Sequence, residues 1–286
     1  MSADGEAGTP QAEPEDSRSQ GPLIHSVVMA GAVLDALGVV AQPIRLTALA
    51  QRLGETKAKI HRHLATLKHI GLIEQDPETE RYRLGQKLAH LGHVAATQFD
   101  LRQFAEPYMR KLRDLTRQTV ALSIAIAGDT VVSLVVESPN LVTISVRVGY
   151  RLPAHSSAQG RINLAFEPEA TREAVLAGKL EALTPRTIID PAALRERLAR
   201  IRREFYDVAM DETMLGISAV AAPILDFQDE VAGVIALVGT TQYVRDPVDP
   251  DQLQVLRACA QAISLKLNST AYAPLGVPLL PDFIFD

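Results

Sequence analysis

The sequence predicts an α+β protein of two domains, in which a small, mainly helical N-terminal domain precedes a larger domain of strands and helices. Its 286 residues are too many for one average domain, and each of two domains of this size can bury its own core. Apolar residues recur every three or four positions before residue 70, whereas runs rich in Val and Ile begin after residue 120. No apolar run reaches the roughly 18 residues of a membrane span, so we expect no membrane partner.

The first twenty residues and the cysteine content bear on where the protein resides. Residues 1–20 contain five acidic residues against Arg18 alone, which predicts a disordered acidic tail. They lack the basic start and the apolar stretch of a secretory signal. Cys259 is the only cysteine, so no intrachain disulfide can form and a reducing compartment is favoured. We therefore expect a cytoplasmic protein.

Two helices are predicted at the start of the N-terminal domain, which spans residues 21–85. Apolar residues at spacings of three and four mark a first helix over 23–37. After the break at Pro43, a second short helix begins with Thr47 as its N-cap and ends at Gly54. Each of these helices would bury one apolar face in a common core.

A third helix and a hairpin complete this domain. The third helix is predicted from residue 56 to residue 69 and stops at Gly71. Two strands over 72–74 and 81–84 follow, joined by turn-forming residues at 76–80. Three helices followed by a hairpin form a winged helix-turn-helix.

Residues 86–100 are predicted to form a linker helix. Its apolar residues Leu88, Leu91 and Ala95 lie at alternating spacings of three and four, a narrow seam typical of a helix that pairs with another helix. We expect this helix to contact a second copy of the chain in a dimer.

The larger domain, over 101–270, is predicted to combine an antiparallel sheet with helices. Its first helix begins at Leu101 and is bent or restarted at Pro107. Val and Ile content predicts strands over 121–127, 131–137, 142–148, 218–225 and 231–238. Periodicity predicts helices over 157–166, 169–177 and 191–203, and a last helix begins at Asp249-Pro250, since Asp caps helices and Pro suits their first position. The apolar residues of the C-terminal tail, residues 271–286, show no periodicity that predicts a helix or a strand.

Charge is distributed unevenly along the chain, whose net charge is −5. Residues 21–90 carry nine basic and six acidic residues, whereas residues 1–20 and 91–286 are each net acidic. A positive domain suits a phosphate backbone as partner, because its cations displace condensed counterions. A chance local excess of cations is the alternative.

The predicted third helix has one apolar face and one cationic face. Ile60, Leu64 and Leu67 share one side, while Arg62 and Thr66 lie roughly opposite. A recognition helix docks its apolar side on neighbouring helices and turns the outward residues of its first turns into the major groove of DNA. An ordinary solvated surface helix is the alternative. The residues predicted to contact double-stranded DNA, including two that flank the hairpin tip, are Thr47, Lys57, Ala58, Lys59, His61, Arg62, Thr66, Arg81 and Arg83.

Several stretches of both predicted domains match the motifs of one known family. They are Thr47-Ala48-Leu49-Ala50, the run KAKIHRHLATLKHIGLIEQ from Lys57 to Gln75, Tyr82-Arg83-Leu84-Gly85, the run GYRLPAHSSAQG from Gly149 to Gly160, Asp211-Glu212, Gly216 and Ala221-Ala222-Pro223. In these stretches the sequence resembles the IclR-type bacterial transcription regulators, and the resemblance spans about residues 23 to 270. The resemblance implies a GAF-like effector-binding domain, a homodimer or homotetramer, and a palindromic operator as DNA partner. Ala58-Lys59 and His63 depart from the family's usual residues, which implies an atypical operator.

The resemblance also implies an effector pocket in the larger domain. In relatives that bind small carboxylates, this pocket uses the loop before the Gly160 helix, a cysteine after the Gly216 turn and two serines on the last strand. The candidate effector-binding residues here are Ala158, Gln159, Gly160, Asp211, Ala219, Ala236 and Val238. Apolar residues where relatives have polar ones give room and remove partners of a small acid, so we expect a larger apolar or aromatic acid as effector. Alternatively, these residues merely pack the sheet. Arg147 and Arg151 are candidates to meet the ligand carboxylate.

An enzyme is the main alternative class. No nucleophile elbow, phosphate loop or zinc-protease motif occurs, and His155-Ser156-Ser157 has no carboxylate at a diagnostic spacing. His90 and His93 lie one turn apart, yet no third metal ligand is evident. We therefore expect no catalytic residue, metal or cofactor. A module that binds no DNA is a further alternative, for which alanine at Lys59 and Arg62 would leave an operator shift unchanged.

Overall fold

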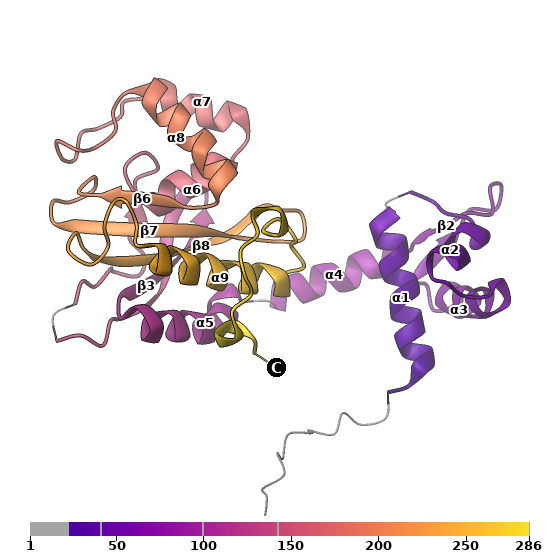
Figure 1. Cartoon of the computed structure of the whole chain (residues 1–286). Helices are drawn as coiled ribbons and strands as arrows, with labels where there is room; N and C mark the ends of the chain where they lie inside the picture. The colour runs from indigo at the N-terminus through magenta and orange to yellow at the C-terminus, as the bar shows by residue number, and fades with distance from the viewer. Residues whose placement is uncertain (1–22, 41, 99, 142, 286) are drawn as a thin grey trace, which may run out of the picture. The chain divides into compact units, whose positions relative to one another are not determined.

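The computed structural model of the chain describes residues 23–285 except 41, 99 and 142. The chain divides into two compact units, with the boundary between Gln98 and Phe99 (Figure 1). The predicted acidic tail, residues 1–20, lies outside the described residues. None of the helices in the described part of the chain has the length and apolar character of a membrane span.

The first unit is a winged helix-turn-helix, as predicted. Its described elements are α1 (His25–Val40), α2 (Leu46–Arg52), α3 (Lys57–His69), β1 (Ile73–Gln75), β2 (Tyr82–Leu84) and the linker helix α4 (Gln86–Gln98). The strands pair antiparallel, with Ile73 opposite Leu84. The first three helices pack on one core, in which Val33, Leu49 and Leu64 are fully buried. Burial of these side chains is what holds α3 in place.

Side-chain capping differs between the two helices of the helix-turn-helix. Thr56 precedes α3, and its hydroxyl accepts the backbone N–H of Lys59 at 3.3 Å. By contrast, Arg45 precedes α2 and makes no side-chain capping hydrogen bond. The prediction that Thr47 caps this helix is wrong, because Thr47 is the second residue of α2 and is already helical.

The second unit is an α+β domain with one six-stranded sheet. Its described elements are α5 (Leu101–Thr116), β3 (Thr119–Ile126), β4 (Asp129–Val136), β5 (Arg151–Leu152), α6 (Ala158–Phe166), α7 (Glu169–Ala177), α8 (Pro191–Glu204), β6 (Asp207–Met210), β7 (Ile217–Leu225), β8 (Val231–Thr240) and α9 (Pro250–Lys266). The strand order is β5-β4-β3-β8-β7-β6, and every neighbouring pair is antiparallel. This is the curled sheet of a GAF-like domain.

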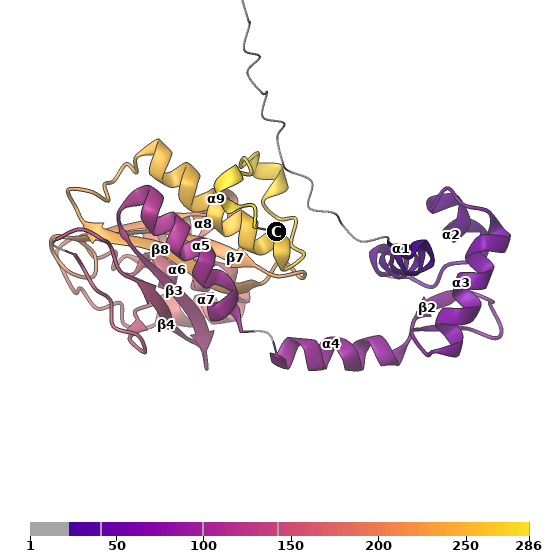
Figure 2. The same cartoon turned by 90° about the horizontal axis from the view of Figure 1, so that it is seen from below.

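The sheet separates two apolar cores. Helices α5 and α9 lie side by side on one face, and α6, with α7 and α8 beyond it, lies on the other (Figures 1 and 2). Alternate residues of each strand enter opposite cores, so that Val220 and Ala222 face α9 while Ala221 faces α6. The face under α6 is rich in alanine at the centre of the sheet, where Ala121, Ala221 and Ala236 are fully buried.

Two sequence-based expectations for the second unit fail. Residues 143–148 form no strand, although Ile144 and Val146 alternate correctly with exposed neighbours. Strand β5 pairs with β4 only at Thr130 and Val131, and residues 143–148 form no ladder with the rest of that edge. Helix α5 does not restart at Pro107, because burial of the flanking turns outweighs the single backbone hydrogen bond that a proline removes.

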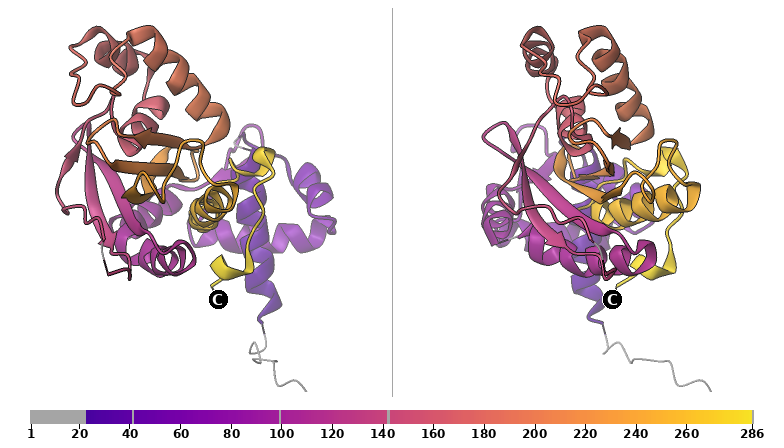
Figure 3. Two further views of the ribbon diagram at one scale, coloured as in Figure 1. Left: turned by 60° about the vertical axis from the view of Figure 1, so that its left-hand side comes forward. Right: turned by 90° about the vertical axis from the view of Figure 1, so that its left-hand side faces the viewer.

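The C-terminal tail packs on the α9 side of the sheet (Figure 3). The Tyr272 hydroxyl is buried and donates to the carbonyl oxygen of Pro223 at 2.7 Å. The ring of Phe285 meets that of Tyr108 edge-on, with centroids 4.5 Å apart. These irregular contacts have no period, which is why the sequence pattern gave no indication of them.

A buried ionic network joins α6 to the strands beside it. Arg161 on α6 is fully buried, and its guanidinium lies 2.6 Å from a carboxylate oxygen of Asp207 and 2.6 Å from one of Glu212. It also donates to the carbonyl oxygens of His155 and Val208. Burial alone would lower the pKa of Arg161, but the two carboxylates raise it above its ordinary value, so the guanidinium stays charged.

Arg161→Leu tests the importance of this network for the second unit. The substitution leaves the buried carboxylate of Glu212 without its cation and that of Asp207 with Arg197 as its remaining close cation, and we expect the free energy of unfolding to fall by about 3–5 kcal/mol. Denaturant unfolding followed by circular dichroism measures the change. Arg195→Leu is the control, since Arg195 makes an exposed ion pair with Glu173 and its loss should leave the midpoint unchanged. Equal midpoints for the two variants would contradict the role given to Arg161.

Candidate DNA-binding surface and effector cavity

Helix α3 presents a polar face to solvent. Ile60, Leu64 and Leu67 are buried in the core of the first unit. The predicted DNA-contacting residues Lys57, Ala58, His61, Arg62 and Thr66 are all exposed on the same helix. The side chains of Lys57 and Arg62 make no hydrogen bond or ion pair with any other described residue, so both cations are available to an anionic partner.

Two other predicted residues of α3 are engaged within the protein. Lys59 is half-buried, and its ammonium lies 2.5 Å from a carboxylate oxygen of Glu55. The Thr66 hydroxyl donates to the backbone carbonyl oxygen of Arg62 at 3.0 Å. Lys59 therefore differs from its neighbours, because a DNA phosphate would have to compete with Glu55.

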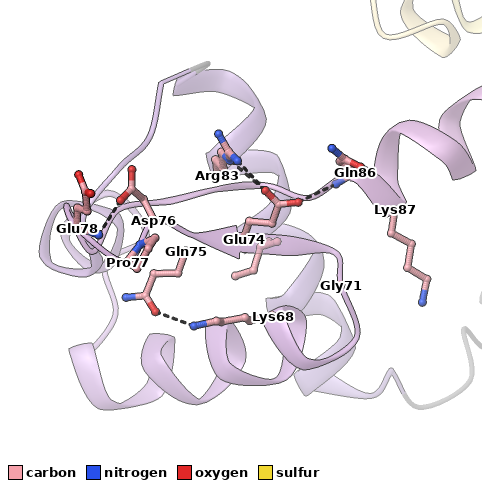
Figure 4. Close-up of a pocket in the computed structure, with 11 residues that line it drawn as sticks. Lys68, Gly71, Glu74, Gln75, Asp76, Pro77, Glu78, Arg83, Gln86 and Lys87 are labelled. Carbon is pink, nitrogen blue, oxygen red and sulfur yellow. Dashed lines mark hydrogen bonds and ion pairs between the residues drawn. The ribbon is translucent and has the colours of Figure 1, made fainter.

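The wing carries its own counter-charges. Arg83 donates to one carboxylate oxygen of Glu74 at 3.1 and 2.9 Å (Figure 4), and these bonds lower the pKa of Glu74. Arg81 donates to the carbonyl oxygen of Pro43 at 3.4 Å. Residues 73–84 hold four acidic residues and two basic ones. The remaining candidate, Thr47, is exposed on α2. The wing is thus far less cationic than its two arginines suggest.

The described residues give no support to the metal and hydrolase alternatives. They contain no group of three or more His, Cys, Asp or Glu side chains that could hold a metal ion. His90 is exposed, and the side chain of His93 lies outside the described residues. His155 meets the carbonyl oxygen of Glu181 at 2.9 Å rather than a serine, and the Ser157 hydroxyl caps α6.

A cavity of about 600 Å³ lies on the α6 face of the sheet in the second unit. The segment 143–147 lines it on one side, and the start of α6 and the loop after β6 line it on others. Most of the wall is apolar, and three of the lining residues are the small Ala158, Ala209 and Ala219. The volume falls within the range that small-molecule sites of proteins occupy.

Few polar groups of this cavity are free to meet a ligand. The hydroxyls of Ser145 and Thr213 donate to Glu137 and to the carbonyl oxygen of Ser156. By contrast, the Arg147 guanidinium and the Tyr150 hydroxyl make no hydrogen bond with any described residue. Arg147 is the single charged side chain among the described residues that line the cavity. The site therefore combines an apolar interior with one cation.

The structure brings some of the predicted effector residues together and separates others. Those that line the cavity are Ala158, Gln159, Ala219 and Val238. The Gln159 side-chain amide donates to the Ser123 hydroxyl at 2.8 Å. Ala236 lies outside the lining, fully buried beneath α6. Arg151 also lies outside it, because it pairs with Asp129 at 2.7 Å.

Gly160 and Asp211 shape the site without lining it. A Cβ on Gly160 would overlap the backbone carbonyl oxygen of Pro153, so only glycine lets α6 approach this loop so closely. The Asp211 carboxylate accepts the backbone N–H of Gly216 at 2.5 Å and closes the loop between β6 and β7. Sequence reasoning did not single out Tyr150, although it stands in the same Gly149–Gly160 run as the predicted residues.

Comparison with protein-family models agrees with both units. A model described as "IclR helix-turn-helix domain" matches residues 26–77, and one described as "Bacterial transcriptional regulator IclR C-terminal" matches residues 93–265. The chain is 31% identical over 251 residues to the HTH-type transcriptional regulator XynR of Escherichia coli, covering 87% of this chain and 100% of XynR. It is 30% identical over 260 residues to KdgR of the same organism, covering 90% and 98%.

Solved structures show the same architecture. A putative IclR regulator from Silicibacter sp. TM1040 superposes with a TM-score of 0.76 at 25% identity, covering 91% of this chain and 99% of that one. HmgR of Pseudomonas aeruginosa gives a TM-score of 0.72 at 28% identity, covering 86% and 99%. An IclR homolog of Microbacterium hydrocarbonoxydans, complexed with 4-hydroxybenzoate, gives 0.54 at 26% identity, covering 85% and 99%.

The matched families and relatives are transcription regulators rather than enzymes. Their helix-turn-helix model lies within the unit that presents α3, and their C-terminal model covers most of the unit that contains the apolar cavity. The chain therefore belongs to the IclR family of DNA-binding transcription regulators, with a C-terminal effector-binding domain.

Proposed function

We propose that this regulator binds a palindromic operator through α3 as a homodimer or homotetramer in the cytoplasm. We further propose that an apolar or aromatic acid, bound in the 600 Å³ cavity, changes its affinity for that operator. The observation that carries the effector proposal is the single cation, Arg147, at the wall of an otherwise mostly apolar cavity. Such a cavity favours a ligand with one carboxylate and a bulky apolar body.

The exposed face of α3 supports the DNA part of the proposal. Lys57 and Arg62 are exposed cations without internal partners, and Ala58 between them would let the helix backbone approach the bases. Arg83 of the wing is already paired with Glu74. We therefore infer that α3 supplies more of the affinity than the wing does. In a two-fold symmetric dimer, two copies of α3 would reach half-sites about 34 Å apart along the duplex.

Three observations support an apolar or aromatic acid as effector. The cavity has a floor of small alanines, so a ring can fit where larger side chains would fill the space. Helix α6 begins at Ala158 beside the cavity, and the N-terminal end of a helix favours a negative charge. A homologous structure with the same fold is complexed with 4-hydroxybenzoate. Ligand control needs no chemistry, only tighter binding to one arrangement of the DNA-binding units than to another.

Arg62→Ala tests the role of α3. Removing a guanidinium that contacts DNA should raise the dissociation constant of the operator complex roughly 5- to 150-fold per contact. Fluorescence anisotropy with a labelled fragment of the DNA upstream of the gene measures it. The control is Lys68→Ala on the same helix, since Lys68 lies in the last turn of α3 and donates to the side chain of Gln75 at 3.1 Å. Unchanged affinity for Arg62→Ala, with the dimer intact, would assign DNA reading to another element.

Arg147→Ala tests the effector site. With excess 4-hydroxybenzoate we expect the melting temperature of the wild-type protein to rise by several degrees, because a ligand at 100 times its dissociation constant adds about 2.7 kcal/mol. Arg147→Ala should weaken binding roughly 10- to 150-fold, as for the loss of a hydrogen bond to a charged group. Arg151→Ala is the matched control, because Arg151 pairs with Asp129 outside the cavity. Stabilisation by pyruvate or glyoxylate but not by aromatic acids would overturn the effector class.

A further inference from the structure

Two large exposed side chains line the apolar cavity from opposite edges of the sheet. Met214, in the loop after β6, is 63% exposed, and Tyr150, directly before β5, is 51% exposed. Strands β5 and β6 are the two edge strands of the sheet, and each also contributes one lining residue, Leu152 and Ala209. The cavity therefore extends to both edges, and one large side chain from each edge meets both the cavity and solvent.

Hydrogen bonds hold the segments that carry these two side chains. The carbonyl oxygen of Tyr150 accepts the backbone N–H of Val132 on β4 at 3.0 Å. Next to Met214, the Thr213 hydroxyl donates to the carbonyl oxygen of Ser156 at 3.1 Å, which ties this loop to the segment before α6. Both side chains thus project from an ordered backbone. A ligand that covers them gains the free energy of removing their apolar surface from water.

Tyr150 lies on the same turn as Arg147, the cation of the cavity. The backbone N–H of Tyr150 donates to the carbonyl oxygen of Arg147 at 3.1 Å, so the two residues are the ends of one turn. Both side chains line the cavity. A carboxylate at Arg147 and a ring beside Tyr150 would therefore lie close together. This arrangement favours an acid whose carboxylate is attached directly to its ring.

We propose that Met214 and Tyr150 hold the ring of an arylcarboxylic acid between them and set the preference of the cavity for aromatic over aliphatic acids. Arg147 cannot provide this preference, because a guanidinium binds any carboxylate. A thioether and a phenol ring each make favourable contacts with an aromatic ring, worth roughly 2- to 12-fold in affinity. This inference rests on the proposed function, since it assigns roles within the proposed effector cavity.

Tyr150→Leu tests the contribution of the phenol ring. Isothermal titration calorimetry on the full-length protein compares benzoate with cyclohexanecarboxylate, two acids of equal charge and similar size of which one is aromatic. We expect the wild-type protein to prefer benzoate. Tyr150→Leu keeps an apolar side chain without a ring, so it should lower the ratio of the two affinities roughly 2- to 12-fold.

Met214→Ala and Leu215→Ala form a matched pair. The two neighbours are 63% and 62% exposed, but of the two only Met214 lines the cavity. Met214→Ala should weaken benzoate binding roughly 2- to 12-fold, whereas Leu215→Ala should bind it like wild type. Because the substituted side chains are exposed, the ligand-free variants should melt at the wild-type temperature, which separates lost binding from unfolding.

The outcomes separate this inference from the function on which it rests. An unchanged affinity ratio in Tyr150→Leu, or equal benzoate affinities in Met214→Ala and Leu215→Ala, would overturn the inference and leave the proposed function standing. If the wild-type protein binds neither benzoate nor 4-hydroxybenzoate, the proposed effector class fails, and the inference fails with it.

Discussion

The effector-binding domain depends on one buried guanidinium, that of Arg161. It joins α6 to Asp207 at the start of β6 and to Glu212 in the following loop. Burial raises the pKa of Glu212, and the charge of Arg161 works against this shift. Glu212 would not tolerate burial in its charged form without this cation, whereas Asp207 is also paired with Arg197 at 2.6 Å. Two segments that are far apart in the sequence, α6 and residues 207–212, are thereby fixed relative to one another.

This ionic network also positions two walls of the apolar cavity on the α6 face of the sheet. The residues of α6 that line it, Ala158 and Gln159, are within one turn of Arg161. Thr213 and Met214, which also line it, directly follow Glu212. Two walls of the cavity are therefore positioned by the same side chain, although Arg161 itself does not line the cavity. Ala209 and Ala219 of the sheet also line the cavity, and their small side chains leave space between these walls.

In the DNA-binding unit, charged side chains lie at the surface rather than in the core. Most of its cations are exposed, and they differ in whether a residue of the protein is already bonded to them. Arg62 has no partner among the described residues, whereas Lys59 is bonded to Glu55 and Arg83 to Glu74. A phosphate contact by Lys59 or Arg83 would first have to break an ion pair. The number of arginines and lysines in the unit therefore overstates the charge that it offers to DNA.

Periodicity was sufficient to predict most helices, and it failed where a contact partner lies far away in the chain. Helix α3 follows from the spacing of Ile60, Leu64 and Leu67, and its start follows from Thr56. The pairing of Arg83 with Glu74 could also have been inferred, because these residues are directly opposite in the hairpin register. By contrast, the alternation of apolar and polar residues over 143–148 indicates an extended segment. It does not indicate whether a neighbouring strand is free to pair with that segment.

The buried network could not be inferred from the sequence for the same reason. The partners of Arg161 lie 46 and 51 residues away, and nothing local distinguishes a buried arginine from a solvated one. Likewise, Arg147 and Arg151 are equivalent candidates in the sequence. Only the fold shows that Asp129 engages Arg151 and leaves Arg147 at the cavity.

We propose above all that a ligand bound in the cavity lined by Ala158, Ala209 and Ala219 changes the affinity of α3 for operator DNA. Filling the cavity with Ala219→Phe and titrating operator DNA with and without 4-hydroxybenzoate tests this most directly. We predict that the acid changes the dissociation constant of the wild-type complex, while the folded variant still binds the operator and gives the same constant with and without the acid. A variant that responds to the acid as the wild type does would contradict the claim.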